Sequence, residues 1–206
     1  MTHLKLFESF KEEEIHAICK EYRIENYTIN EDGSIDVEWC ILINRKLNKL
    51  PLKFRNILDD FVCSFNELTS LEGCPKSVGG GFNCRCNELT SLDGCPEKVR
   101  GNFDCDNNQL SSLEGCSKFI GGHFDCTNNK ITTFEQLPFS IGGYFHCAGN
   151  PINEIWELFK DYSKIEFLND CDAIREPNII ILDRLNFFLE EIGKPTVTKV
   201  KGYKCI

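Results

Sequence analysis

The chain has 206 residues, and its 32 acidic and 23 basic side chains give a net charge of −9. This length suits one continuous core, and the acidic excess lies in residues 1–39, so we expect no nucleic-acid partner, which would need clustered Lys and Arg. No stretch reaches the ~18 consecutive apolar residues of a membrane span, and residues 1–10 lack the features of a secretory signal, so we expect no membrane partner and a cytoplasmic location.

Residues 1–39 are expected to form an N-terminal cap made of a helix and a β-hairpin. Ser9 with Glu12 makes a capping box, and the apolar residues that follow recur at helical spacing. Asp32-Gly33 then separates two short alternating segments, residues 27–29 and 35–37, which indicates a hairpin. A repeat protein needs such a cap because its terminal unit would otherwise expose its core face.

From Cys40 to Ile152 the sequence repeats itself every 21 residues, and residues 40–60 are a degenerate first unit. Each of the following units aligns a phenylalanine, a cysteine two residues later and an asparagine three residues after that, beginning with Phe61, Cys63 and Asn66. Such a fixed period predicts a solenoid. We therefore assign residues 40–152 to an α/β solenoid in which 21-residue units form a parallel β-sheet.

The columns of the repeat predict local structure. Alternation at Phe and Cys predicts a short strand with two inward side chains. The asparagine amide is expected to bond open backbone groups at the following bend, each asparagine supporting the next. Glycines that close each unit permit backbone conformations that a side chain would oppose, and the segment before them is too short for a helix and should be extended or turn-like.

The thirteen cysteines would indicate a disulfide framework in a small secreted chain. Their number is odd, and most lie in register at core positions, where a thiol behaves as a small hydrophobe. Stacked cysteines about 4.8 Å apart could oxidise or hold a soft metal. A ladder of parallel side chains gives neither the torsion of a disulfide nor a tetrahedral site, so we expect free thiols and no cofactor.

Residues 153–206 are expected to form a C-terminal helical cap. Ile155, Trp156 and Phe159 begin a short helix, and a second capping box, Ser163 with Glu166, indicates another. A helical stripe follows and stops at Gly193 and Pro195; its members are Leu182, Leu185, Phe188, Leu189 and Ile192. The tail from residue 197 to 206 is a candidate final strand.

The repeat resembles the short bacterial type of the leucine-rich repeat family, with Phe and Cys in place of two strand leucines. It is more similar to leucine-rich repeat proteins of bacteriophages, in which Leu-Thr-Ser-Leu-Glu-Gly-Cys-Pro-Lys, here Leu68 to Lys76, recurs many times. The segments 26–36 and 183–202 look like that group as well, so the resemblance covers nearly the whole chain. It implies a phage origin and a recognition role. Gln136-Leu137 departs from the Gly-Cys of earlier units, so the fourth unit should bend differently.

The candidate binding residues alternate with the inward columns and should form one outward sheet face. Unlike the inward columns, they vary from unit to unit. We expect a partner-binding site made of Asn83, Arg85, Asn102, Asp104, Asp106, His123, Asp125, Tyr144 and His146. On the last three strands these residues would form an acidic patch edged with aromatic and imidazole groups, which suits a basic or mixed protein surface.

Other interpretations of this face remain open. It is also consistent with a solvated sheet face carrying incidental charges. A metal held by His123, Asp125 and His146 is geometrically possible on neighbouring strands, although a flat face offers no pocket for it.

The sequence favours a protein-binding module over an enzyme. It contains no phosphate loop, nucleophile elbow or His-Glu-x-x-His motif, so we expect no catalysis and no small-molecule substrate. If the chain is encoded by a phage, the resemblance implies a role in the host cytoplasm, as an inhibitor of a host protein or of a defence system. A structural virion component is the alternative, followed by a DNA mimic, for which only residues 8–38 are acidic enough.

Overall fold

The computed structural model describes residues 11–134, 136–152, 174–175, 179–200 and 204–206. The chain forms two compact units, Met1–Lys130 with Glu135–Asn150, and Ile131–Phe134 with Pro151–Ile206. The expected short helix at Ile155 and the capping box at Ser163 lie outside the described residues.

The first unit opens with the expected helix and hairpin: α1 (Glu12–Tyr22), β1 (Tyr27–Ile29) and β2 (Ile35–Val37). The helix begins later than its capping box predicts, because Lys11 is the N-cap and the Glu14 carboxylate accepts the Lys11 amide N–H at 2.9 Å. Ile15 and Cys19 are the buried residues of α1. Strands β1 and β2 pair antiparallel, and β2 then pairs in parallel with the next strand of the solenoid.

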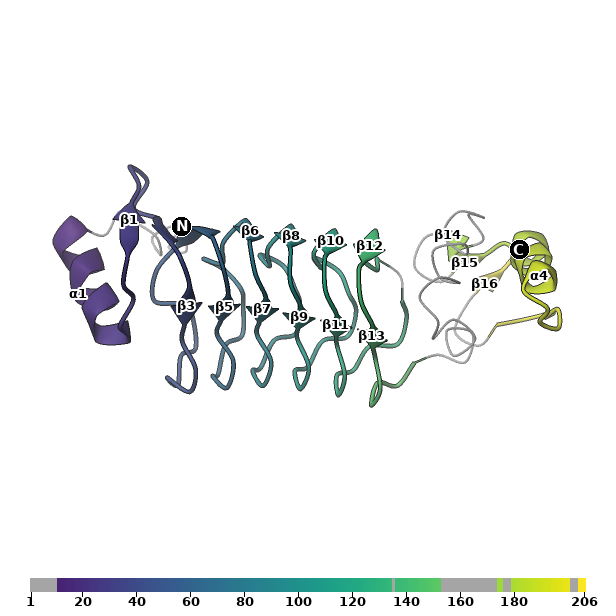
Figure 1. Cartoon of the computed structure of the whole chain (residues 1–206). Coiled ribbons are helices and arrows are strands. Elements are labelled where there is room, and N and C mark those ends of the chain that lie inside the picture. The colour runs from purple at the N-terminus through teal and green to yellow at the C-terminus, as the bar shows by residue number, and fades with distance from the viewer. Residues whose placement is uncertain (1–10, 135, 153–173, 176–178, 201–203) are drawn as a thin grey trace, which may run out of the picture. The chain divides into compact units, whose positions relative to one another are not determined.

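The repeats fold into a parallel β-solenoid in which each turn contributes two short strands (Figure 1). Sheet A has the order β1-β2-β4-β6-β8-β10-β12, with β4 (Phe54–Ile57), β6 (Ser77–Val78), β8 (Lys98–Val99), β10 (Phe119–Ile120) and β12 (Ser140–Ile141). Sheet B has the order β13-β11-β9-β7-β5-β3, with β3 (Cys40–Ile41), β5 (Phe61–Val62), β7 (Phe82–Asn83), β9 (Phe103–Asp104), β11 (Phe124–Asp125) and β13 (Phe145–His146).

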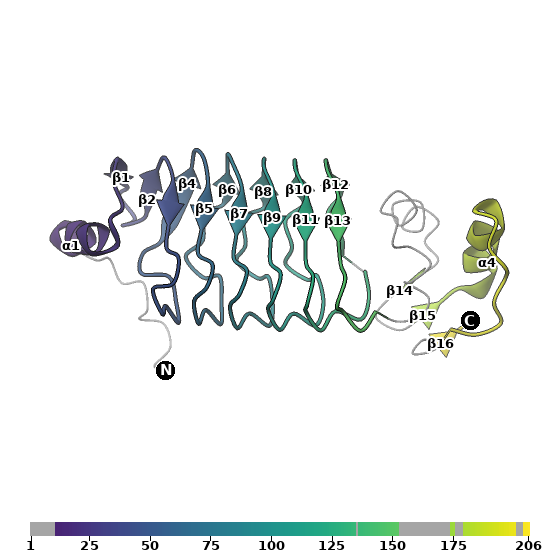
Figure 2. The same cartoon turned by 60° about the horizontal axis from the view of Figure 1, so that its bottom comes forward.

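Two sheets replace the single sheet that the sequence predicts. The segment before each glycine pair was expected to be extended or turn-like, and it forms the strands of sheet A, side by side in both views (Figures 1 and 2). The 21-residue register itself is confirmed: Phe61 pairs with Phe82 in sheet B, and Val78 pairs with Val99 in sheet A. Cys40 pairs with Phe61, so residues 40–60 do form the first repeat.

The core of the solenoid is a column of phenylalanines flanked by a column of cysteines. Phe61, Phe82, Phe103 and Phe124 are fully buried, and successive ring centroids along this column lie 5.1–5.9 Å apart. Cys63, Cys84, Cys105 and Cys126 are also fully buried. Inward Phe and Cys therefore pack against their own kind in the neighbouring turns, as the repeat predicts.

The asparagine ladder bonds backbone groups of two turns at once. The Asn108 Nδ2 donates to the Cys105 carbonyl of its own turn and to the Cys84 carbonyl of the turn before, each at 3.1 Å, while its Oδ1 accepts the Leu89 N–H at 3.0 Å. Asn87 and Asn129 repeat this pattern. Each amide therefore ties neighbouring turns through their main chains.

Left-handed backbone occurs just before each of these asparagines. The residues there have φ between 52° and 56° although none is glycine, and they are Phe65, Cys86, Asn107 and Asn128. The glycines that close each unit serve another purpose: a Cβ at Gly101 would lie 2.7 Å from the Gly80 carbonyl carbon. These glycines allow neighbouring turns to approach closely.

The second unit contains β14 (Ile174–Arg175), β15 (Ile179–Ile180), α4 (Leu182–Glu191) and β16 (Lys204–Cys205). The helix follows the predicted stripe, with Leu185, Phe188 and Leu189 buried, and Gly193 has the left-handed φ of 70° that ends it. The tail forms a strand at 204–205, which pairs in parallel with β15.

Candidate functional site

The predicted site residues lie on the outward face of sheet B and beside it. Strand register places Asn83, Asp104, Asp125 and His146 in one row across β7, β9, β11 and β13, because each is paired with the next. They alternate with the buried phenylalanines and cysteines, so their side chains point away from the core. The structure thus brings this row together as the repeat predicts.

A second row, one residue before the phenylalanines, is held by hydrogen bonds from backbone to side chain. Asn102 Oδ1 accepts the His123 N–H at 2.9 Å. His123 Nδ1 accepts the Tyr144 N–H at 2.8 Å. Because Nδ1 is an acceptor here, the neutral imidazole carries its proton on Nε2, which stays available to a ligand.

Three rings gather on the last strands of this face. His123 stacks on Tyr144 with centroids 5.0 Å apart and planes inclined by 14°. His146 lies 6.3 Å from His123 and 6.2 Å from Tyr144. Tyr144 is 71% exposed although both imidazoles flank it. This arrangement presents an aromatic side chain already held in place, as an anchor of a protein interface requires.

The carboxylates next to these rings belong to Asp104 and Asp125, which lie in the partly buried first row. Burial raises the pKa of Asp104, the nearby charges of Asp125 and Asp106 raise it further, and Arg85 and His123 oppose the rise. Asn83 Nδ2 donates to Asp104 at 3.3 Å, and Asp125 accepts the Thr127 N–H at 2.9 Å. A carboxylate whose charge is disfavoured in this way gains from a cationic partner group.

Arg85 is the one predicted site residue of positive charge, and it partly faces another column. Its guanidinium carbon lies 5.1 Å from the centre of the Phe65 ring, in the left-handed column. Asp106 likewise receives a hydrogen bond from the Asn107 amide of that column. These two side chains therefore form the border of the site.

Sheet B has a depression of about 390 Å³ that the sequence analysis did not foresee. Three predicted residues line it, Asn83, Asn102 and Asp104, together with Asp60. Its origin is Gly81, which stands between Asp60 and Asn102 in the outward row and carries no side chain. That missing side chain was the available signal.

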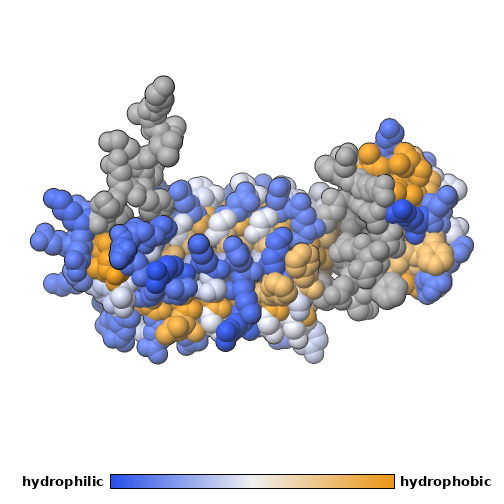
Figure 3. Space-filling model, turned by 90° about the horizontal axis from the view of Figure 1, so that it is seen from above, coloured by the Kyte–Doolittle hydropathy of each residue, from blue (hydrophilic) through white to orange (hydrophobic). Residues whose placement is uncertain are grey.

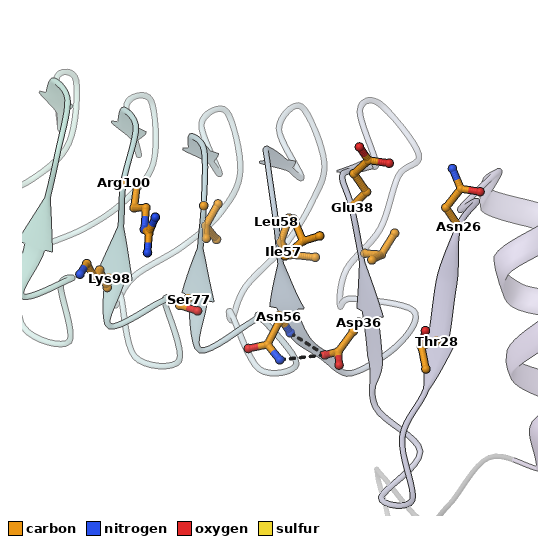
Figure 4. A pocket seen from close by; sticks show the side chains of 13 residues that line it. Asn26, Thr28, Asp36, Glu38, Asn56, Ile57, Leu58, Ser77, Lys98 and Arg100 are labelled. Atoms are coloured by element: carbon orange, nitrogen blue, oxygen red, sulfur yellow. Dashed lines mark hydrogen bonds between the residues drawn. The ribbon is translucent and has the colours of Figure 1, made fainter.

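A larger hollow, of about 630 Å³, lies on sheet A and was also missed (Figure 4). It is lined by strands β1, β2, β4, β6 and β8 and by residues just after them. Its side of the solenoid is mostly hydrophilic but broken by hydrophobic patches (Figure 3). The sequence predicts strands at residues 27–29 and 35–37, but only an extended or turn-like segment before each glycine pair, so no outward face is expected for β4, β6 and β8.

Metal ligation finds no geometric support in the part of the chain that the structure describes. No three His, Cys, Asp or Glu side chains there are grouped closely enough to hold an ion, and this includes His123, Asp125 and His146. The described cysteines are free thiols. Burial raises the pKa of Cys63 to about 12 and that of Cys95 to about 11, which keeps both protonated near neutral pH.

The fold and face define a parallel β-solenoid with an irregular, polar outward surface. No protein-family model, curated protein or solved structure matches the chain. The likeness to leucine-rich repeats therefore remains a resemblance in the repeat sequence. Among the described residues, no helix combines the length and apolar character needed to cross a membrane.

Proposed function

We propose that the protein is a binding module that recognises a partner protein through the outward face of sheet B. The observation that carries this is the ring cluster of His123, Tyr144 and His146, which stands beside the Asp104 and Asp125 carboxylates on paired strands. A broad surface of unlike side chains on a regular backbone is how solenoids bind partners. Such a surface needs no pocket for chemistry.

The chemistry of this face favours a partner with basic side chains. A Lys or Arg placed over Tyr144 would contact the face of the ring, where cations are attracted. His123 covers one face of the Tyr144 ring, so this group would contact the opposite face. Further basic groups of the partner would meet Asp125 and favour ionised Asp104. Arg85, at the border, is the one positively charged residue of the predicted site. The surface is therefore electrostatically complementary to a basic patch on a partner.

The identity of the partner follows from the sequence resemblance. Similarity to phage-encoded leucine-rich repeat proteins makes a host bacterial protein the proposed target, and inhibition of a host defence system the proposed consequence. In this proposal residues 1–39 and 153–206 act as caps of the solenoid. The site would act in the host cytoplasm without cofactor or catalysis.

Capture from bacterial lysate tests the proposal. Tagged protein should retain one stoichiometric partner, and the pair of substitutions Asp104→Lys and Tyr144→Ala should abolish its capture with no loss of thermal stability, since both side chains point outward. Glu88→Lys is the matched control, because Glu88 is exposed and lies off both sheets.

Two results would contradict the proposal. Capture that survives the double substitution would place the binding site elsewhere on the chain. A protein that retains nothing from lysate but is found in purified phage particles would be a virion component.

A further inference from the structure

The hollow on sheet A opens at Gly79, where neighbouring turns approach too closely for a side chain: a Cβ there would overlap the Leu58 carbonyl oxygen. Leu58, Gly79 and Arg100 occupy equivalent positions just after β4, β6 and β8. Gly79 leaves a gap between its two long neighbours, and the hollow of about 630 Å³ opens there. Figure 4 shows Leu58 between Glu38 on one side and Arg100 on the other.

The two ends of this hollow carry opposite charges. Glu38 follows β2 at one end, and Lys98 and Arg100 lie on and just after β8 at the other. Within the described residues, none of these three side chains has an ion-pair or hydrogen-bond partner. Asp36, which also lines the hollow, is already paired with Arg55 and bonded to Asn56. One acidic and two basic groups therefore face solvent unpaired.

The middle of the hollow carries one exposed apolar side chain. Leu58 is 75% exposed, and the floor beneath it contains the buried side chains of Ile57 and Val78. The polar Asn56 and Ser77 lie on the same strands. An exposed leucine next to a gap offers contact area to an apolar group that can enter. Along the residues that follow β2, β4 and β8, the order is therefore acidic, apolar, basic.

We propose that this hollow binds an extended peptide segment of a partner protein, lying across the strands, in which a basic and an acidic residue flank an apolar one. Glu38 and Arg100 are separated by three strand spacings in the sheet order β2-β4-β6-β8, which is about 14 Å. An extended chain advances about 3.3 Å per residue and returns to the same face every second residue. The charged residues of the peptide should therefore be about four positions apart, with the apolar residue midway.

Polyanions fit this hollow less well. Glu38 lies in the same hollow as Lys98 and Arg100 and would repel a phosphate backbone, which requires neutralisation along its length. The net charge of −9 adds long-range repulsion. A short peptide of mixed charge meets both ends with complementary groups. This site is separate from sheet B, and the proposal does not depend on the function assigned to that face.

Selection from a displayed library of random twelve-residue peptides tests the proposal. Wild-type protein should enrich peptides with the basic, apolar and acidic residues at alternating positions in one chain direction. The charge-swapped variant Glu38→Lys with Arg100→Glu should enrich the same spacing with the two charges exchanged. The proposal would be overturned if the wild-type protein enriched no such motif. It would also be overturned if the wild-type and charge-swapped proteins enriched the same motif.

Binding of the selected wild-type peptide then identifies the contacts. In fluorescence polarisation, Arg100→Glu and Leu58→Asp should each weaken binding by about tenfold or more. Both side chains are exposed, so circular dichroism should show unchanged melting. Lys49→Glu, an equivalent charge reversal at an exposed residue off both sheets, should leave affinity within about twofold. Equal loss in Lys49→Glu would reduce the interaction to net charge and contradict the site.

Discussion

Replacement of Asn108 by alanine should destabilise the solenoid because it removes bonds that join two turns. The side chain is only 8% exposed, and it accepts the Leu89 N–H and donates to the carbonyls of Cys84 and Cys105. Both carbonyls keep a bond from another asparagine, Asn87 or Asn129. Only the Leu89 N–H loses its sole partner among the described residues.

The size of the loss follows from this distribution of bonds. An unpaired buried N–H costs about 1–3 kcal/mol, and each lost bond to a carbonyl that keeps another partner adds at most about 1 kcal/mol. We therefore expect Asn108→Ala to lower the free energy of unfolding by about 1–5 kcal/mol. Loss of any stacking between turns would come in addition.

Urea titration followed by circular dichroism measures this loss. Gln109→Ala is the control, because the exposed side chain of this neighbour accepts a surface hydrogen bond from the Lys130 amine and the backbone bond of Gln109 to Leu89 is kept. It should change stability by less than about 0.5 kcal/mol. If Asn108→Ala unfolds at the same urea concentration as wild type, the ladder does not hold the turns together.

Three further perturbations test the core, the outward face and the thiols. Phe103→Ala should lower the free energy of unfolding by about 3–5 kcal/mol in urea titration, since the ring is fully buried between two others. Because the pKa of Asp104 is raised in the folded state, its charged form opposes folding as pH rises above the ordinary value of about 4. Asp104→Asn should therefore raise the melting temperature at pH 7 but not at pH 3, and an equal rise at both would refute the burial argument. Iodoacetamide followed by peptide mass spectrometry should label Cys86 before Cys84, because Cys86 is half-buried in the left-handed column and Cys84 is fully buried with its pKa raised well above normal.

The repeat register was predictable because a strict period transfers from one unit to the next. The pairing of Phe61 with Phe82 and the bonds of Asn108 follow directly from aligned columns. The second sheet was not predictable in the same way. Both sheets contain strands of two residues, as in Ser77–Val78 and Phe82–Asn83. In sheet B the alternation continues past the strand to the cysteine, whereas the glycines that follow Val78 are typical of a turn.

The position of the candidate site could be predicted from the sequence, but the hollows in the surface of the solenoid could not. Outward rows follow from the period, which placed Asp104 beside Asp125. Each hollow lies beside a glycine, Gly81 on sheet B and Gly79 on sheet A, although the column of Gly79 also has glycine at positions 121 and 142. The side chains that surround such a glycine lie one turn away in space but 21 residues away in sequence. The hollow is therefore visible only once the turns are stacked. The left-handed column was missed because Phe65 and Cys86 are residue types that seldom adopt positive φ, whereas Asn107 and Asn128 in the same column do so more readily.

The uniform spacing of the turns makes the length of the solenoid a heritable variable. Duplication of one 21-residue unit would add one strand to each sheet and move every later outward residue by about 4.8 Å, while each inward column simply gains one member. Deletion of residues 82–102 would do the reverse and place His123 next to Gly81 in the outward row. Unequal recombination within the gene can therefore change the order of the surface residues while the inward columns of the core stay the same.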